Sequence, residues 1–290
     1  MKVAAYQAPL HATSSMDVLG LIREQLDWCE SNGVEFLCCP EGVLGGLADY
    51  ASRPTDIAIN VEAGQLHAHL APLASDRVTT ILGFTEISRC GKLYNSAAVF
   101  HKGSVAGIYR KLYPSINRSI YEAGDKMPVF TVGDLTFGII ICLDSNYYEP
   151  ARIMVAKGAA ALFVPTNNGL PPMKAGPELV AQARNVDIAR AVENSVSVIR
   201  ADVAGRTESL VSYGSSEIVD GEGMVIESAR QLAPDLIVAN IKTAPHGHRL
   251  ECNASRNRAV MDEYVGLVTG MHTGGEGKEE KKETPRPNGV

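Results

Sequence analysis

The centre of the chain reads Leu135-Thr-Phe-Gly-Ile-Ile-Ile-Cys142-Leu-Asp-Ser-Asn-Tyr-Tyr-Glu149-Pro-Ala-Arg152. Its first seven residues form a short apolar run rich in isoleucine, which predicts a buried strand. We expect a helix over residues 150–157, because proline has the backbone φ that the first turn of a helix needs. Cys142 therefore lies where a buried strand ends, shortly before a helix begins.

On both sides of this stretch, short apolar runs alternate with amphipathic ones. Residues 16–31 repeat their apolar positions at the spacing of one helical face, and 178–193 contains few helix breakers. Further strands are expected over 2–7, 34–39, 79–85, 94–100, 104–109, 160–164, 196–201, 217–219, 224–227 and 236–240, and a further helix over 61–74. The alternation predicts an α/β layered domain with a mixed sheet.

Composition narrows the classes of partner. The chain has 290 residues, a formal net charge of -6 and 45% hydrophobic residues, and this gives no basic surface for nucleic acid. No apolar run approaches the roughly 20 residues that span a bilayer, so we expect no membrane partner. The first residues lack a secretory pattern, which predicts a cytoplasmic protein.

We expect one domain over 1–265 and an extended or disordered tail over 266–290, because the end of the chain is rich in Gly, Glu, Lys and Pro.

The six cysteines are irregularly spaced, and we expect free thiols in a chain of this size without a leader. The sequence has no CxxC pair, and no histidine stands at zinc-ligand spacing from a cysteine, so we predict no metal site. The adjacent pair Cys38-Cys39 raises the hypothesis of a thiol redox function. This hypothesis is disfavoured because adjacent cysteines form a disulfide poorly.

Three segments place polar residues directly after expected strands. They are Pro40-Glu41, Arg110-Lys111 and Cys142, and the carboxyl ends of strands are where α/β folds place their sites. Each segment alone has a simpler interpretation as a surface glutamate, a solvated lysine or a buried cysteine. What distinguishes Cys142 is that Asp144 and Glu149 follow it closely. In the helix expected over 178–193, we interpret Arg184 and Arg190 as pairing with acidic residues on the helix surface.

Together, Pro40-Glu41, Arg110-Lys111 and Cys142-Leu-Asp144 followed by Glu149 resemble the nitrilase superfamily of carbon–nitrogen hydrolases. The likeness runs from about residue 1 to residue 262. It implies a four-layer α-β-β-α sandwich and assembly into a homodimer or a larger homo-oligomer. One departure is Tyr148, which stands where proline is common in the family.

The resemblance also implies roles for individual residues. Cys142 would be the nucleophile and Glu41 the general base and acid, while Lys111 and the backbone N–H of Leu143 would stabilise the oxyanion. Glu149 would orient the lysine or the substrate, or else pair with Arg152 at the start of the helix. Asn167 and Asn168, which follow another expected strand, line the pocket or are ordinary loop residues. Neither a metal nor an organic cofactor is implied.

The residues after the nucleophile bear on the substrate. Nitrile-cleaving members of the superfamily usually have Trp-Glu after the cysteine, whereas this chain has Leu143-Asp144. The resemblance therefore favours small amides, ω-amides or N-carbamoyl compounds as substrates, with a nitrilase as the alternative. A non-catalytic member that binds a partner would be expected to lose Glu41, Lys111 or Cys142, and all three are present.

Overall fold

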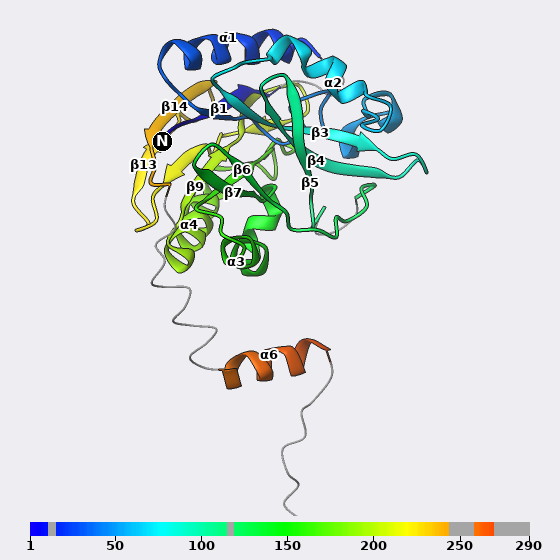
Figure 1. Cartoon of the computed structure of the whole chain (residues 1–290). Coiled ribbons are helices and arrows are strands. Elements are labelled where there is room, and N and C mark those ends of the chain that lie inside the picture. The colour runs from blue at the N-terminus through cyan, green and yellow to red at the C-terminus, as the bar shows by residue number, and fades with distance from the viewer. Residues whose placement is uncertain (11–15, 115–118, 244–257, 270–290) are drawn as a thin grey trace, which may run out of the picture. The chain divides into compact units, whose positions relative to one another are not determined.

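The computed structural model describes residues 1–10, 16–114, 119–243 and 258–269 (Figure 1). Their strands form two sheets, one of eight strands and one of six. The second sheet contains the strand that leads to Cys142. Most elements coincide with the sequence prediction to within a few residues.

The eight-stranded sheet has the order β11-β10-β1-β2-β3-β4-β5, and β14 pairs with β1 as well. The strands β1, β2 and β3 are parallel, and β4 and β5 continue the sheet in antiparallel fashion. The sheet is therefore mixed, as predicted. Its strands are β1 (Lys2–Pro9), β2 (Phe36–Cys38), β3 (Thr79–Ile87), β4 (Leu93–His101), β5 (Ser104–Arg110), β10 (Val203–Arg206), β11 (Val211–Ser212) and β14 (Asp235–Asn240).

The six-stranded sheet has the order β13-β12-β9-β8-β7-β6, with β7, β8 and β9 parallel. Its strands are β6 (Val129–Val132), β7 (Leu135–Ile139), β8 (Ala161–Pro165), β9 (Ser197–Ala201), β12 (Glu217–Val219) and β13 (Val225–Ser228). The sequence prediction missed β6, β10 and β11. Each of these strands has four residues or fewer, and periodicity alone rarely identifies so short a strand.

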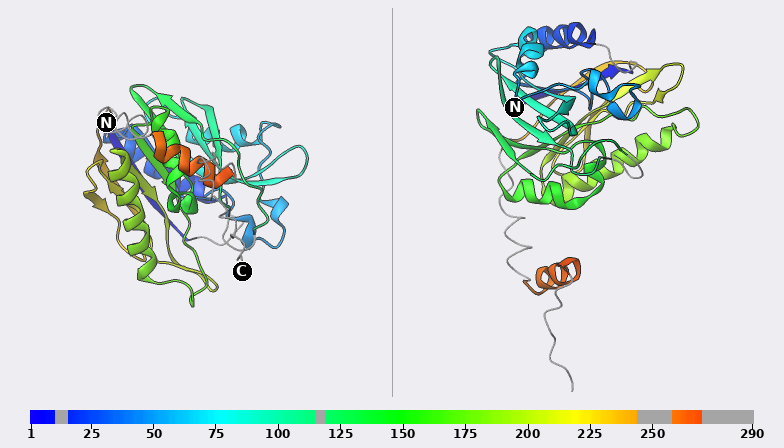
Figure 2. Two further views of the ribbon diagram at one scale, coloured as in Figure 1. Left: turned by 90° about the horizontal axis from the view of Figure 1, so that it is seen from below. Right: turned by 90° about the vertical axis from the view of Figure 1, so that its right-hand side faces the viewer.

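Helices cover the outer face of each sheet, as Figures 1 and 2 show. They are α1 (Val18–Ser31), α2 (Gln65–Leu70), α3 (Tyr148–Ala156) and α4 (Pro177–Asn194). The buried face of α1 packs on the eight-stranded sheet, while α3 and α4 contact β7 and β9 of the other. The order helix, sheet, sheet, helix confirms the expected four-layer sandwich. The second helix is shorter than predicted, because Gly64 at φ 76° precedes it and a 3₁₀ turn containing Pro72 follows.

An aromatic cluster fills the space between the two sheets. Phe36 on β2 meets Phe137 on β7 edge to face, with ring centroids 5.4 Å apart. Phe163 on β8 stacks on Phe36 at 5.8 Å and contacts Phe137 at 5.2 Å. All three side chains are buried. Because β2 and β7 lead to Glu41 and Cys142, this cluster sets the distance between two strand ends of the predicted site.

The chain divides into two compact units, Met1–His246 and Gly247–Val290. In the second unit the described element is α6 (Arg258–Thr269). The boundary that we predicted between 265 and 266 falls inside this helix, and residues 270–290 of the predicted tail lie outside the described residues. Among the helices of the described ranges, none is both long and apolar enough to cross a membrane.

We expect Phe137→Ala to lower the free energy of unfolding by about 3–5 kcal/mol, because it leaves a cavity between the two sheets. Denaturant unfolding followed by circular dichroism measures this change. Met173, whose side chain is fully exposed, provides the control: Met173→Ala should change stability by less than about 0.5 kcal/mol. A loss of similar size in both variants would contradict the role assigned to the cluster.

Candidate active site

The three predicted strand-end residues come from three different strands, and two of them are in direct contact. Glu41 follows β2, Lys111 follows β5 and Cys142 follows β7. The Nζ of Lys111 lies 2.5 Å from Oε1 of Glu41, although the residues are 70 positions apart in the chain. Both side chains are almost completely buried. A buried ion pair of this kind is retained only where other groups hydrogen-bond the charges.

Glu41 receives those hydrogen bonds from two asparagines. Nδ2 of Asn95, on β4, donates to Oε1 at 2.7 Å, and the backbone N–H of Asn167 donates to Oε2 at 3.0 Å. Gly83 on β3 leaves room for this turn, since a Cβ there would lie 2.6 Å from the Cα of Glu41. The role of Asn95 was not predicted. Its signal in the sequence is a polar residue near the start of a strand.

The backbone of Cys142 adopts φ 46°, a left-handed conformation that is rare for a residue with a side chain. Cys142 begins the 3₁₀ turn Cys142–Asn146. The hydroxyl of Ser145 donates to the carbonyl of Cys142 at 2.8 Å, and Oδ2 of Asp144 accepts the N–H of Ile141 at 3.1 Å. Such a conformation costs on the order of 1–3 kcal/mol and is typical of reactive residues held by their surroundings.

Asp144 links two segments of the site. One is the turn Cys142–Asn146, here called the cysteine turn, and the other is the segment 111–114 after β5, here called the lysine loop. Its buried carboxylate accepts the O–H of Tyr109 at 2.7 Å and the N–H of Tyr113 at 2.8 Å. These residues stand on either side of Lys111. Burial raises the pKa of Asp144 to about 6, although the Lys111 charge acts in the opposite direction. Asp144 thus holds Lys111 and Cys142 in register.

The electrostatics keep the thiol neutral. Burial and then the charge of Glu41 raise the pKa of Cys142 to about 12, against the opposing charges of Lys111 and Arg200. For Lys111, burial alone would lower the pKa, but the charge of Glu41 prevails and raises it above its ordinary value. At neutral pH Lys111 is therefore an ammonium and Cys142 a protonated thiol, so attack by sulfur requires a base.

A second network of buried hydrogen bonds joins the cysteine turn to α4 and β9. Arg200 on β9 donates two hydrogen bonds to Asp187, at 2.6 and 2.5 Å, and a third to the hydroxyl of Ser145 at 3.0 Å. Arg190 on α4 donates to the backbone carbonyl of Ser145 at 2.9 Å. Both arginines and Asp187 are buried.

This corrects our expectation for the helix surface. Arg190 does pair with Glu193, but it is buried, and Arg184 bonds Glu217 on β12 instead of an acidic residue of its own helix. The spacing along a helix identifies which residues share a face. It does not identify what covers that face.

A pocket of about 200 Å³ opens at Cys142. One wall is a face of α4, and another is the cysteine turn. The lining residues besides Cys142 are Leu143, Asn146, Asn168, Leu179, Gln182, Ala183 and Arg200. Leu143 and Asn168 line this pocket, whereas the backbone N–H of Asn167 contacts Glu41.

Glu149 lies in a different place. It stands in the first turn of α3 and lines a separate pocket of about 350 Å³ together with Leu112 and Tyr113, the two residues after Lys111. The predicted orienting role of Glu149 stays a prediction. The structure brings it near the lysine loop rather than into the pocket at Cys142.

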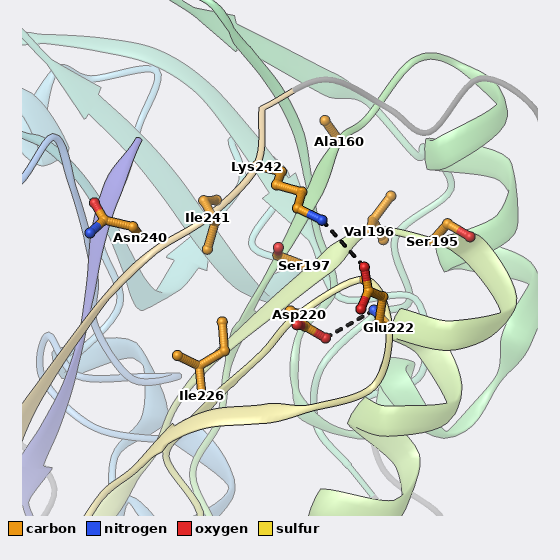
Figure 3. Close-up of a pocket in the computed structure, with 11 residues that line it drawn as sticks. Ala160, Ser195, Val196, Ser197, Asp220, Glu222, Ile226, Asn240, Ile241 and Lys242 are labelled. Atoms are coloured by element: carbon orange, nitrogen blue, oxygen red, sulfur yellow. Dashed lines mark hydrogen bonds and ion pairs between the residues drawn. The ribbon is translucent and has the colours of Figure 1, made fainter.

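Other features of the described residues offer less chemistry. One further pocket has a volume of about 100 Å³ and contains none of the predicted site residues. In it, Lys242 and Glu222 point toward each other (Figure 3). Within the described residues, no group of three or more potential ligands could hold a metal ion. The cysteines that the structure describes are free thiols, and among them Cys90 is exposed.

The sequence is similar to that of known proteins. Residues 2–245 match the sequence profile of the family described as carbon-nitrogen hydrolase. The "hydrolase in pqqF 5′ region" of Pseudomonas protegens is 30% identical over 236 residues, which cover 79% of each chain. A probable nitrilase of Schizosaccharomyces pombe is 30% identical over 205 residues, covering 69% of this chain and 72% of that protein.

Solved structures share the fold at lower identity. A carbon-nitrogen hydrolase from Helicobacter pylori G27 superposes with a TM-score of 0.75 at 20% identity, covering 94% of this chain and 98% of that one. A mutant of the amidase from Nesterenkonia sp. AN1 gives 0.71 at 22% identity, with coverage of 90% and 97%. The sequence match over nearly all of the first compact unit and the shared fold lead to one conclusion: the chain belongs to the carbon-nitrogen hydrolase family of the nitrilase superfamily.

Proposed function

We propose that the chain hydrolyses small amides, ω-amides or N-carbamoyl compounds through a thioester on Cys142. The observation that carries this proposal is the buried Lys111–Glu41 pair, at 2.5 Å, assembled at strand ends beside a thiol in a strained turn. The pocket at Cys142 supplies room for a small substrate. A purely binding member of the fold would be expected to lose Glu41, Lys111 or Cys142, and all three are present.

In the first half of the reaction, Sγ of Cys142 attacks the carbonyl carbon and its proton passes to Glu41. The oxygen of the substrate becomes an oxyanion, which the Lys111 ammonium and the N–H of Leu143 stabilise. Such a donor typically contributes about 3–4 kcal/mol. Glu41 then gives the proton to the nitrogen, the carbon–nitrogen bond breaks, and ammonia or an amine leaves a thioester behind.

In the second half, water attacks the thioester carbon and loses its proton to Glu41. The carbon–sulfur bond breaks, and the proton returns to the sulfur as the acid is released. Water and substrate are the only reactants in this scheme, so it involves neither a metal nor an organic cofactor. Lys111 remains charged throughout, because its raised pKa keeps the ammonium intact.

Nitrile hydrolysis is the alternative within the same chemistry. It is favoured by the names of two relatives, the probable nitrilase above and a nitrilase of Pyrococcus abyssi that is 29% identical over 188 residues. Against it stands Leu143-Asp144 after the nucleophile. Glutamine belongs among the test substrates too, since glutamine-dependent NAD⁺ synthetases are also relatives, at 26% identity. A homo-oligomer and a cytoplasmic location remain proposals.

The first test measures ammonia release from a panel of short amides, ω-amides, N-carbamoyl amines, glutamine and nitriles. We expect turnover of at least one amide-type compound and a loss of at least about a thousandfold in Cys142→Ser. Cys90→Ser, which changes an exposed thiol, should retain full activity. Full activity in Cys142→Ser would refute the mechanism, and turnover restricted to nitriles would favour the alternative.

The second test separates the charge of Glu41 from its action as a base. Glu41 raises the pKa of Cys142, so Glu41→Gln should lower that pKa and increase the thiolate fraction at pH 8. We expect iodoacetamide to alkylate Cys142 about tenfold faster in this variant, which corresponds to one pKa unit. Amide turnover should fall by at least about a hundredfold, because the base is lost.

Mass spectrometry of the peptide that contains Cys142 measures the alkylation rate from pH 6 to pH 10. The matched control is Glu24→Gln, which removes an exposed carboxylate on α1 and should alter neither rate. Slower alkylation in Glu41→Gln than in the wild type would contradict the proposed electrostatics, whatever happens to turnover.

A further inference from the structure

Asn168 presents its side-chain carbonyl to the nucleophile. It follows β8, and its Oδ1 lies 4.0 Å from Sγ of Cys142. The residue is part of the wall of the pocket at Cys142. An amide side chain offers either an acceptor or a donor at such a place, depending on which way it is turned.

The surroundings of Asn168 decide the direction. Its Nδ2 donates to Oδ2 of Asp202 at 3.1 Å and to the hydroxyl of Ser215 at 3.2 Å. Ser215 uses its single hydroxyl hydrogen on Asp202, at 2.7 Å, so it accepts from Asn168. Turning the amide over would set its oxygen against a carboxylate oxygen. Both side-chain N–H groups are thus used, and the oxygen is the atom that faces Cys142.

Asp202 makes this orientation rigid. It is fully buried and lies between β9 and β10, where the chain passes from one sheet to the other. Besides Nδ2 of Asn168 and the Ser215 hydroxyl, its carboxylate accepts the backbone N–H groups of Asn168, Val203 and Ser215 at 2.8–3.0 Å. An acceptor-only group with five donors around it leaves Asn168 no second arrangement.

We propose that Oδ1 of Asn168 accepts an N–H of the carbon–nitrogen bond being cleaved, and that Asp202 positions it for this task. The inference rests on the proposed function and narrows its substrate class to carbon–nitrogen bonds whose nitrogen carries hydrogen. The scissile nitrogen is bonded to the same carbon that Cys142 attacks. An oxygen that lies 4.0 Å from Sγ is close enough to this nitrogen to accept its N–H when the nitrogen lies on the Asn168 side of the attacked carbon.

The contact selects among leaving groups. An amide or carbamoyl nitrogen donates one N–H to Asn168 and, as the tetrahedral carbon forms, directs its lone pair toward the proton on Glu41. A nitrile nitrogen has no hydrogen and would meet an oxygen lone pair, and an ester oxygen has none either. A buried acceptor left without a donor disfavours such substrates.

The test compares leaving groups on one acyl group. Primary amides and p-nitrophenyl esters of acetic, propionic and butyric acid form the same thioester on Cys142, so any difference between them arises in acylation. We expect Asn168→Ser to lower kcat/KM for the amide about tenfold, the effect of one hydrogen bond. The value for the ester should stay within about twofold, and the matching nitrile should not lose rate.

Two further variants make the result specific. Asp202→Asn replaces one of the two acceptor oxygens that orient Asn168 with an NH2 donor and removes the charge, so it should lower the amide-to-ester ratio in the same direction. Asn168→Leu is a second substitution if either variant unfolds. Asn240→Leu, which changes an exposed amide on β14, should leave the ratio unchanged. Thermal unfolding of each variant verifies that it is folded.

An unchanged ratio in folded Asn168 variants would overturn the inference, as would equal losses for amide and ester, which would indicate that Asn168 only supports Cys142. A wild-type preference for the nitrile would overturn it while leaving Cys142 as the nucleophile. Absence of any thioester on wild-type Cys142 would refute the proposed function itself, and the two failures are therefore distinguishable.

Discussion

The buried ion pair between Lys111 and Glu41 is the interaction on which the site depends. Two charges removed from water are tolerated only when each faces the other and the remaining hydrogen-bonding positions are filled. Asn95 and Asn167 donate hydrogen bonds to Glu41, and Gly83 allows the backbone of Glu41 to approach β3. The pair joins the ends of two strands of one sheet and presents a cation and a base to a thiol from the other.

The six-stranded sheet contributes the nucleophile Cys142, and the eight-stranded sheet contributes the charges that act on it. The thiol is neutral at rest, since burial and Glu41 together raise its pKa, and this makes the carboxylate necessary. Asp144 connects the cysteine turn to the lysine loop, while Arg200 and its partner Asp187 support the same turn from the helix side. Each of these charged groups has several hydrogen bonds, so the geometry beside Cys142 is set before a substrate arrives.

The passage of the chain from β9 to β10 connects architecture with specificity. Asp202 occupies this crossover, and its hydrogen bonds turn Asn168 toward Cys142. Around it, the pocket is lined by neutral side chains, apart from Arg200, whose charge is balanced by Asp187. A neutral pocket with one fixed acceptor beside the nucleophile fits a small uncharged amide-type substrate.

The amino-acid sequence by itself determined the alternation of strands and helices, the buried face of α1, and the strand-end positions of Glu41, Lys111 and Cys142. These are local properties, because periodicity and punctuation operate over a few residues. Only the tertiary structure decided that Asn95 bonds Glu41, that Asp187 and Arg190 are buried rather than on a helix surface, and that Asp202 turns Asn168. Those contacts join residues up to 54 positions apart. A local pattern carries no information about which distant group will satisfy a buried charge.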